Sequence, residues 1–183
     1  MPAMVMRFWP GWTWARERIV DGAYGRLTSL HLERLGSRPG WSSTYADDAA
    51  TGGALVDLHI HDADFVYWCL GEPRDVRSVG SLTQVSTQYR FAESARVAPG
   101  ACVTAVGGWG QQSSFGFRMR FVANFERATA DFDLARGEQP LMLSDAEGSR
   151  PVGVGTLSAY DAEVRHMLDV VRGRAEQRAS LAD

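Results

Sequence analysis

The segment from Ala54 to Leu70 constrains the fold of this chain more than any other part of its sequence. It lies between the pair Gly52-Gly53 and the sequence Gly71-Glu72-Pro73, which are typical helix boundaries. The segment is far longer than an ordinary strand of about six residues. Most positions around its helical wheel are apolar, as in a buried helix. The sequence therefore predicts one buried helix here.

The polar residues of this helix gather on one side. At about 100° per residue, four side chains fall within an arc of about 60°: Asp57, His61, Asp64 and Trp68. Asp57 and His61 are four residues apart, so they can pair directly, which offsets the cost of burying them. A carboxylate beside an imidazole orients the ring and raises its basicity, as in general bases. A buried pair that only stabilises the helix has the same spacing, so both interpretations stay open.

The order Asp57-Leu58-His59-Ile60-His61 also resembles the Asp-x-His-x-His signature of metal hydrolases. On a strand, residues two apart face the same side, and His59 and His61 would share one ion. On a helix they point about 160° apart. We therefore predict no metal site and keep a metal-hydrolase remnant as an alternative.

Two glycine-rich sequences are weaker signals. The sequence Gly153-Val154-Gly155 before Ser158 is a degenerate dinucleotide fingerprint, but no convincing parallel strand precedes it. The sequence Gly107-Gly108-Trp109-Gly110 is more typical of a bend or bulge in a sheet. Neither assigns a cofactor-binding residue.

The rest of the chain is predicted to consist mainly of strands. We expect a helix from Thr13 to Asp21, long loops over 36–53 and 85–100, and a last helix that begins with a Ser158–Asp161 capping box. The strands are expected at 27–35, 76–84, 101–106, 117–125, 128–134, 141–143 and 152–154. The last helix has an apolar stripe, expected to be buried, of Tyr160, Val164, Met167, Leu168 and Val171. Runs of strands with few helices predict an α+β fold: one domain over 1–183, with an open, mainly antiparallel sheet and helices on one face.

Composition excludes several classes of function. The net charge of −3 provides no basic field for nucleic acid, and no apolar run is long enough to span a membrane. The N-terminus has no signal-peptide pattern, so a cytoplasmic location is expected. Cys69 and Cys102 are expected to be buried thiols. All 19 basic residues are arginine, so no chemistry that needs a lysine can be completed within this chain.

Three stretches together resemble one known family. They are Met6-Arg7-Phe8-Trp9-Pro10, the stretch from Ile19 to Leu27, and the stretch from Gly52 to Asp64. They are similar to the C-terminal domain of the glucose-fructose oxidoreductase, inositol dehydrogenase and rhizopine-catabolism family (GFO/IDH/MocA). The third stretch matches the family's Gly-Gly-x-Leu-x-Asp-x-x-x-His-x-x-Asp helix. The resemblance covers nearly the whole chain and implies a fold like the C-terminal domain of glyceraldehyde-3-phosphate dehydrogenase.

The resemblance also implies a function. It implies an NAD- or NADP-dependent oxidoreductase acting on a sugar, cyclitol or related polyol. In that setting His61 would take the hydroxyl proton and Asp57 would orient or assist it. The substrate-binding residues would be Arg7, Trp9, Trp41, Tyr45 and Asp64, with Arg7 contacting either substrate or cofactor.

The chain departs from the family pattern in one major respect. The nucleotide-binding half and its catalytic lysine are missing, so we interpret the chain as a truncated or excised domain, inactive alone and without tight cofactor binding. Its expected partners are a polyol, the missing nucleotide-binding domain and further copies joined through the sheet. A noncatalytic interaction module, associating through the face that includes 117–125, is the alternative.

Overall fold

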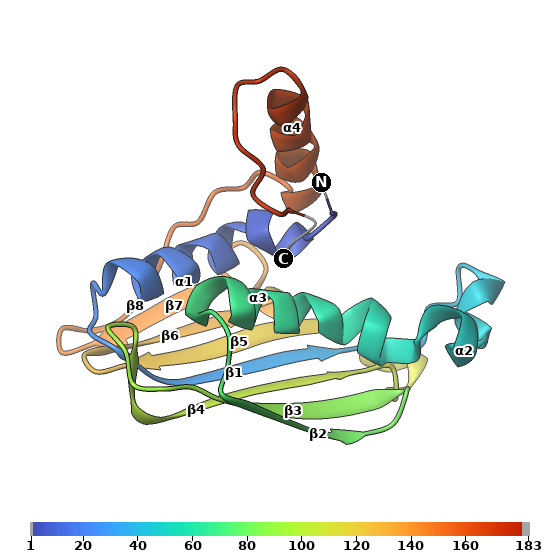
Figure 1. The fold of residues 1–183 in the computed structure, drawn as a ribbon, viewed down its shortest axis with the longest axis horizontal. Helices are drawn as coiled ribbons and strands as arrows, with labels where there is room; N and C mark the ends of the chain where they lie inside the picture. The colour runs from blue at the N-terminus through green and yellow to red at the C-terminus, as the bar shows by residue number, and fades with distance from the viewer. Residues whose placement is uncertain (1, 181–183) are drawn as a thin grey trace.

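The computed structural model describes residues 2–180 and shows the predicted α+β fold (Figure 1). One sheet has the strand order β2-β3-β4-β1-β5-β6-β7-β8. β1 is parallel to β4, and the other neighbouring strands are antiparallel. The strands are β1 (Leu27–Leu35), β2 (Asp75–Gly80), β3 (Gln84–Arg90), β4 (Val97–Gly108), β5 (Arg118–Phe125), β6 (Ala128–Asp133), β7 (Leu141–Asp145) and β8 (Gly148–Pro151).

Two helices, α1 and α3, cover one face of this sheet, and the opposite face is open (Figure 1). The longer helices are α1 (Pro10–Asp21), α3 (Ile60–Leu70) and α4 (Ala159–Val171). The short ones are η1 (Val5–Phe8), η2 (Ser43–Ala46), α2 (Asp48–Thr51), η3 (Leu55–His59), η4 (Ser113–Phe115) and η5 (Leu134–Arg136). Among residues 2–180, no helix combines the length and apolarity needed to cross a bilayer.

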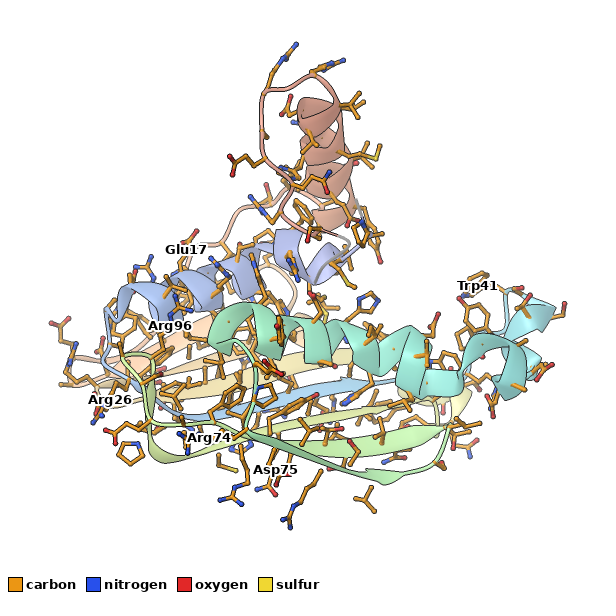
Figure 2. The ribbon with its side chains drawn as sticks, in the orientation of Figure 1. Glu17, Arg26, Trp41, Arg74, Asp75 and Arg96 are labelled. Atoms are coloured by element: carbon orange, nitrogen blue, oxygen red, sulfur yellow. The ribbon has the colours of Figure 1, made fainter. Side chains whose placement is uncertain are left out.

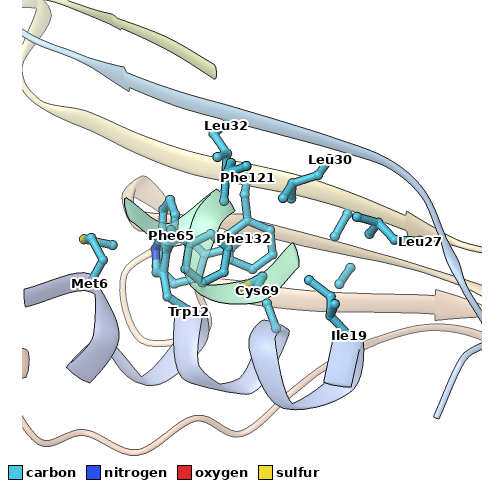
Figure 3. Close-up of a cluster of buried hydrophobic side chains, with 14 of the residues drawn as sticks. Met6, Trp12, Ile19, Leu27, Leu30, Leu32, Phe65, Cys69, Phe121 and Phe132 are labelled. Carbon is cyan, nitrogen blue, oxygen red and sulfur yellow. The ribbon is translucent and has the colours of Figure 1, made fainter. Parts of the chain in front are cut away.

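The core lies between the two covering helices and the sheet (Figure 3). Trp12 of α1 is fully buried and meets Phe65 of α3 edge-on, with ring centroids 4.7 Å apart. It also meets Phe121 of β5 at 5.3 Å, and Phe121 stacks on Phe132 of β6 at 5.4 Å. The apolar side of β5 therefore packs against α1, and the open face of the sheet carries the polar side chains of this strand.

The first helix begins earlier than the sequence predicts. Pro10 occupies the first helical position, where its missing N–H and fixed φ are tolerated, and Trp9 is the N-cap. Thr13 lies inside the helix, and its hydroxyl donates to the carbonyl of Pro10 at 2.9 Å. The helix ends at Gly22 with a φ of 65°, as expected for a glycine stop.

The region after α3 contains one more strand than predicted. The expected strand 76–84 is instead β2 and the turn that follows it, and β3 occupies part of the expected 85–100 loop. In β3 the side chains of Val85, Thr87 and Tyr89 are buried. Because Thr87 is polar, the sequence does not show the alternation of apolar and polar residues that would predict a strand. β4 also extends beyond the predicted 101–106 in both directions.

The C-terminal predictions need three corrections. Residues 152–154 form no strand, and the last strand is β8 just before them. Ser158 precedes α4, but its side chain makes no capping hydrogen bond. The apolar stripe of α4 is exposed rather than buried, because α4 stands away from the sheet (Figure 1). Cys102 is likewise exposed, whereas Cys69 is buried as predicted.

A buried ion pair joins α3 to the central strand β1. The Nη2 atom of Arg34 lies 2.8 Å from Oδ1 of Asp62, and its Nε atom donates to Oδ2 at 3.2 Å. Arg34 is 3% exposed and Asp62 is fully buried. The guanidinium also lies 5.3 Å from the Trp12 ring centre and 3.0 Å from the sulfur of Met119. The pair fixes the height and register of α3 on the sheet.

Replacing Asp62 alone is expected to destabilise the fold strongly. Asp62→Ala leaves the Arg34 guanidinium buried without its carboxylate, which costs about 3–5 kcal/mol of unfolding free energy. The double variant Arg34→Met with Asp62→Leu should recover most of that loss, because both charges are removed together. Urea unfolding measures both values. Asp75→Ala, which breaks the exposed pair with Arg77, is the matched control and should change little. Equal losses in Asp62→Ala and Asp75→Ala would contradict the structural role of the buried pair.

Candidate active site

The predicted helix is interrupted by a π turn at the candidate catalytic residues. Residues Leu55–His59 form the π-helical segment η3, and the regular helix α3 begins at Ile60. A π turn contains one residue more than an α turn, so Asp57 and His61 are not stacked as the regular wheel predicts. Within residues 2–180 the two side chains form no hydrogen bond with each other. The Asp57–His61 pair expected from the spacing is therefore not formed in this structure.

Asp57 is instead contacted by the loop that precedes the helix. The Tyr45 hydroxyl donates to Oδ1 of Asp57 at 3.5 Å, a long hydrogen bond. The pKa of Tyr45 is raised, first by burial and then by the negative charge of Asp57 and this bond. The Asp57 carboxylate, in the middle of the π turn, thus has a phenol as its neighbour.

His61 is a partly buried imidazole on the first turn of α3. Its Nδ1 atom is buried without a hydrogen-bond partner in the described part of the chain. Burial, followed by the positive charge of Arg34, lowers the pKa of His61, although Asp62, Asp57 and Asp64 oppose the shift. The lowered pKa favours the neutral form of the ring at neutral pH.

His59 points in a different direction and makes a structural contact. It is 3% exposed, and its Nε2 lies 2.9 Å from the Thr87 hydroxyl on β3. A Cβ atom on Gly107 would lie 3.1 Å from its Nδ1, so a glycine in β4 allows this close approach. No cluster of three potential metal ligands is found among residues 2–180.

Arg7 and Asp64 are bound to each other. The Nη2 atom of Arg7 lies 2.6 Å from Oδ1 of Asp64, and Nε contacts both carboxylate oxygens at 3.1–3.2 Å. Arg7 also donates to the carbonyl of Arg178 at 2.6 Å and lies 5.5 Å from the Trp68 ring centre. Both candidate residues therefore lie at the contact of η1 with α3, beneath the C-terminal segment.

An aromatic cluster stands beside Asp57. The ring of Tyr45 lies edge-on between Trp41 and Trp109, with centroid distances of 4.7 and 5.5 Å. Trp41 is 78% exposed, and Figure 2 shows it beside α2. Arg38 holds the loop in place: it donates to the carbonyl of Tyr45 at 2.5 Å and pairs with Asp48. The expected loop over 36–53 is thus an ordered structure that includes η2 and α2.

Arg38 and Trp109 belong to this cluster although no sequence pattern predicted them. Arg38 precedes a proline in a presumed loop, and nothing local marks it as the organising residue. Trp109 lies in the glycine-rich sequence interpreted only as a bend, although a tryptophan among glycines was an available signal. Trp9 lies elsewhere, at the start of α1, where its ring contacts Tyr160 of α4 at 6.4 Å.

A shallow apolar cavity of about 260 Å³ lies along α3. It is lined by Met4, Ile60, Ala63, Asp64, Val66, Tyr67, Pro73 and Tyr89. The lining includes Asp64 but neither Asp57 nor His61. Among the predicted residues, the structure therefore groups Asp57 with Tyr45 and Trp41, and Arg7 with Asp64, while Trp9 faces α4.

Comparisons with known proteins agree with the family resemblance. The sequence profile of the GFO/IDH/MocA C-terminal domain matches residues 12–130. No curated protein matches the chain.

Solved structures with a similar fold include several dehydrogenases. Levoglucosan dehydrogenase, solved with NADH and levoglucosan, has a TM-score of 0.78 at 18% identity, covering 100% of this chain and 59% of its own. An oxidoreductase from Desulfitobacterium hafniense, described as NADPH-dependent, has a TM-score of 0.75 at 15% identity, covering 98% and 57%. UDP-N-acetylglucosamine 3-dehydrogenase from Acidithiobacillus ferrooxidans has a TM-score of 0.70 at 18% identity, covering 94% and 52%. The chain thus spans little more than half the length of these structures.

The two histidines of the π turn and α3 are expected to titrate below pH 6.5. Burial is the largest cause of the lowered pKa of both His59 and His61. Since the unfolded imidazoles take up protons near pH 6.5, the stability that these residues contribute is complete above that pH and is lost as the pH falls. NMR titration of the imidazole protons, assigned with His59→Gln and His61→Gln, measures both midpoints. A midpoint above 6.5 for His61 would show that the neighbouring carboxylates outweigh burial.

Proposed function

Because the chain belongs to the GFO/IDH/MocA family as a C-terminal domain, we propose that it is the substrate domain of an NAD(P)-dependent oxidoreductase. Its substrate class is a sugar, cyclitol or related polyol. The observation that carries the proposal is the His61 imidazole on α3, whose pKa is lowered by burial and whose buried Nδ1 has no hydrogen-bond partner among residues 2–180. Each of the three similar structures named above is a dehydrogenase or an oxidoreductase.

The proton-transfer step is assigned to this chain. His61 accepts the hydroxyl proton at Nε2 as the carbinol becomes a carbonyl, because its lowered pKa keeps the ring unprotonated at neutral pH. Asp57, held beside the Tyr45 hydroxyl, provides a negative charge near the imidazolium that forms. When bound, NAD or NADP supplies the acceptor for the hydride.

We also propose that residues 2–180 do not bind a nucleotide tightly on their own. The degenerate glycine sequence at 153–155 lies in irregular chain between β8 and α4, not at a strand-to-helix turn that could cradle a pyrophosphate. We therefore propose that a nucleotide-binding domain supplies the cofactor. The exposed side of α3 supports such a partner, because Ile60 and Tyr67, seven residues apart on this helix, are each more than two-fifths exposed.

The aromatic cluster supports a sugar-like substrate. Trp41 presents an exposed ring against Tyr45, which in turn contacts Asp57, and apolar ring faces combined with a few polar groups are usual in small-molecule sites. Trp41 and Tyr45 are proposed to form the wall of the substrate pocket. The Arg7–Asp64 pair and Trp9 are proposed to complete it, with Arg7 reaching substrate or cofactor once the partner domain is in place.

The open face of the sheet is the proposed contact between copies. Many of its side chains are polar, and some form ion pairs between neighbouring strands, as Arg118 does with Glu33 and Arg120 with Asp131. A polar face of this kind favours a hydrated, specific protein–protein contact over a nonspecific hydrophobic one. A module that uses this face without catalysis remains the second candidate, and it is supported by the lack of a covering helix there among residues 2–180 (Figure 1).

A polyol should shift the titration of His61 in the isolated chain. Titrating the protein with levoglucosan and with myo-inositol, each to high concentration, should move the His61 midpoint because a bound hydroxyl would contact Nε2. His59 is the internal control, since it faces the sheet and should stay fixed. If neither polyol moves His61, the noncatalytic module is favoured.

Turnover should require a nucleotide-binding domain. The purified chain should not reduce NAD or NADP with any polyol, and a signal from it would refute the proposed incompleteness. Fused behind the nucleotide-binding domain of levoglucosan dehydrogenase, the chain should oxidise a polyol, and His61→Ala should lower kcat by about 10²–10⁴-fold. His31→Gln, on the open face of the sheet, is the matched control and should retain activity. Equal activity in His61→Ala would contradict the assigned base.

A further inference from the structure

The π turn η3 is attached at both ends to the hairpin formed by β2 and β3. At its start, the Ala54 N–H donates to the carbonyl of Leu82, in the turn of that hairpin, at 2.6 Å. Gly53, with a φ of 64°, allows this approach, since a Cβ atom there would lie 2.2 Å from the same carbonyl oxygen. At its end, His59 contacts Thr87 of β3. The turn is thus held between two fixed points.

The second attachment is a chain of three polar side chains that reaches the edge strand β2. The Thr87 hydroxyl lies 2.9 Å from Nε2 of His59 and 2.8 Å from the Ser78 hydroxyl. Ser78 and Thr87 are directly opposite each other in the antiparallel pair of β2 and β3, so their side chains share one face. His59 and Thr87 are each 3% exposed. Because buried polar groups cost free energy unless they are hydrogen-bonded, Thr87 determines where the imidazole can lie.

A glycine in the next strand shapes the space around the same imidazole. Gly107 of β4 lies opposite Val85 of β3. A Cβ atom on Gly107 would lie 3.1 Å from Nδ1 and 3.2 Å from Cβ of His59. A larger residue at 107 would therefore push the ring away from the sheet, so the ring has little room to move.

These attachments decide which group meets Asp57. In a regular α-helix, residues four apart lie one above the other, and Asp57 would pair with His61. The extra residue of the π turn removes this overlap, and Asp57 accepts from Tyr45 instead. π turns are rare, and an unusual backbone persists only where the surrounding structure determines it. The two contacts with the hairpin supply that restraint.

We propose that His59, bound to Thr87, is a positioning residue that keeps η3 in the π register. It thereby prevents a direct hydrogen bond between Asp57 and His61 and leaves the His61 imidazole available to a substrate hydroxyl. The effect on position rests on the contacts of His59, whereas its consequence for catalysis rests on the proposed function.

NMR titration of His61 in the full chain, without polyol, tests this role. His59→Leu and Thr87→Val each remove the attachment and keep most of the bulk of the side chain. If η3 then relaxes to the α register, the Asp57 carboxylate pairs with His61 and should raise its midpoint by about 0.5–1 pH unit. His59→Gln, whose amide can still reach the Thr87 hydroxyl, should keep the midpoint of the unchanged chain.

Thr104→Val is the matched control. The Thr104 hydroxyl lies 2.8 Å from Nδ1 of His31, so this variant also loses a contact between a threonine and a histidine, but on the open face of the sheet. It should leave His61 unchanged. Tyr45 provides a second readout, because its raised pKa depends in part on Asp57. That pKa should fall in His59→Leu and Thr87→Val, as measured from the ¹³C shifts of the tyrosine ring.

A histidine that only stabilises the core would give a different result. His59→Leu and Thr87→Val would then lower the unfolding temperature but leave the His61 midpoint and the Tyr45 pKa unchanged, which would overturn the proposal. An equal rise in His59→Gln or Thr104→Val would also overturn it. If His59→Leu fails to fold, Thr87→Val decides the outcome, because valine and threonine have nearly the same shape. A polyol that fails to move His61 in the unchanged chain counts against the proposed function and not against the role of His59.

Discussion

The buried Arg34–Asp62 pair is the interaction on which the candidate site depends. Asp62 directly follows His61 on α3, and Arg34 is fixed in β1 between its two neighbouring strands. The pair therefore determines how far α3 stands above the sheet and which side it turns outward. The same guanidinium charge lowers the pKa of both His59 and His61. The ion pair thus positions the candidate base, whereas burial is the largest cause of its lowered pKa and the two charges of the pair act on that pKa in opposite directions.

The sequence predicted the fold class well because its strongest patterns are local. β1 has the predicted limits, and the alternation through β5 is unbroken apart from Phe117 at its start. β3 was missed because its central buried residue is Thr87, which hydrogen-bonds with His59. That partner comes from a distant segment. A polar residue buried for the sake of a long-range bond has no signature in its own neighbourhood.

The candidate site shows a different limit. The regular wheel placed Asp57 over His61, but the π turn displaces them, and Asp57 meets Tyr45 instead. Burial of Asp62 was also not foreseen, since only the opposing Arg34 distinguishes it from its neighbours. Sequence spacing identified the helix and its chemical groups, whereas the pairings among them depend on tertiary contacts.

The exposed apolar stripe of α4 shows the same limit: a local pattern predicts the helix, but tertiary contacts decide whether its apolar side is buried. Its periodicity correctly indicates that one side of the helix is apolar, but not which surface covers it. Within this chain, η1 occupies the opposite side and the sheet is too far away to contribute.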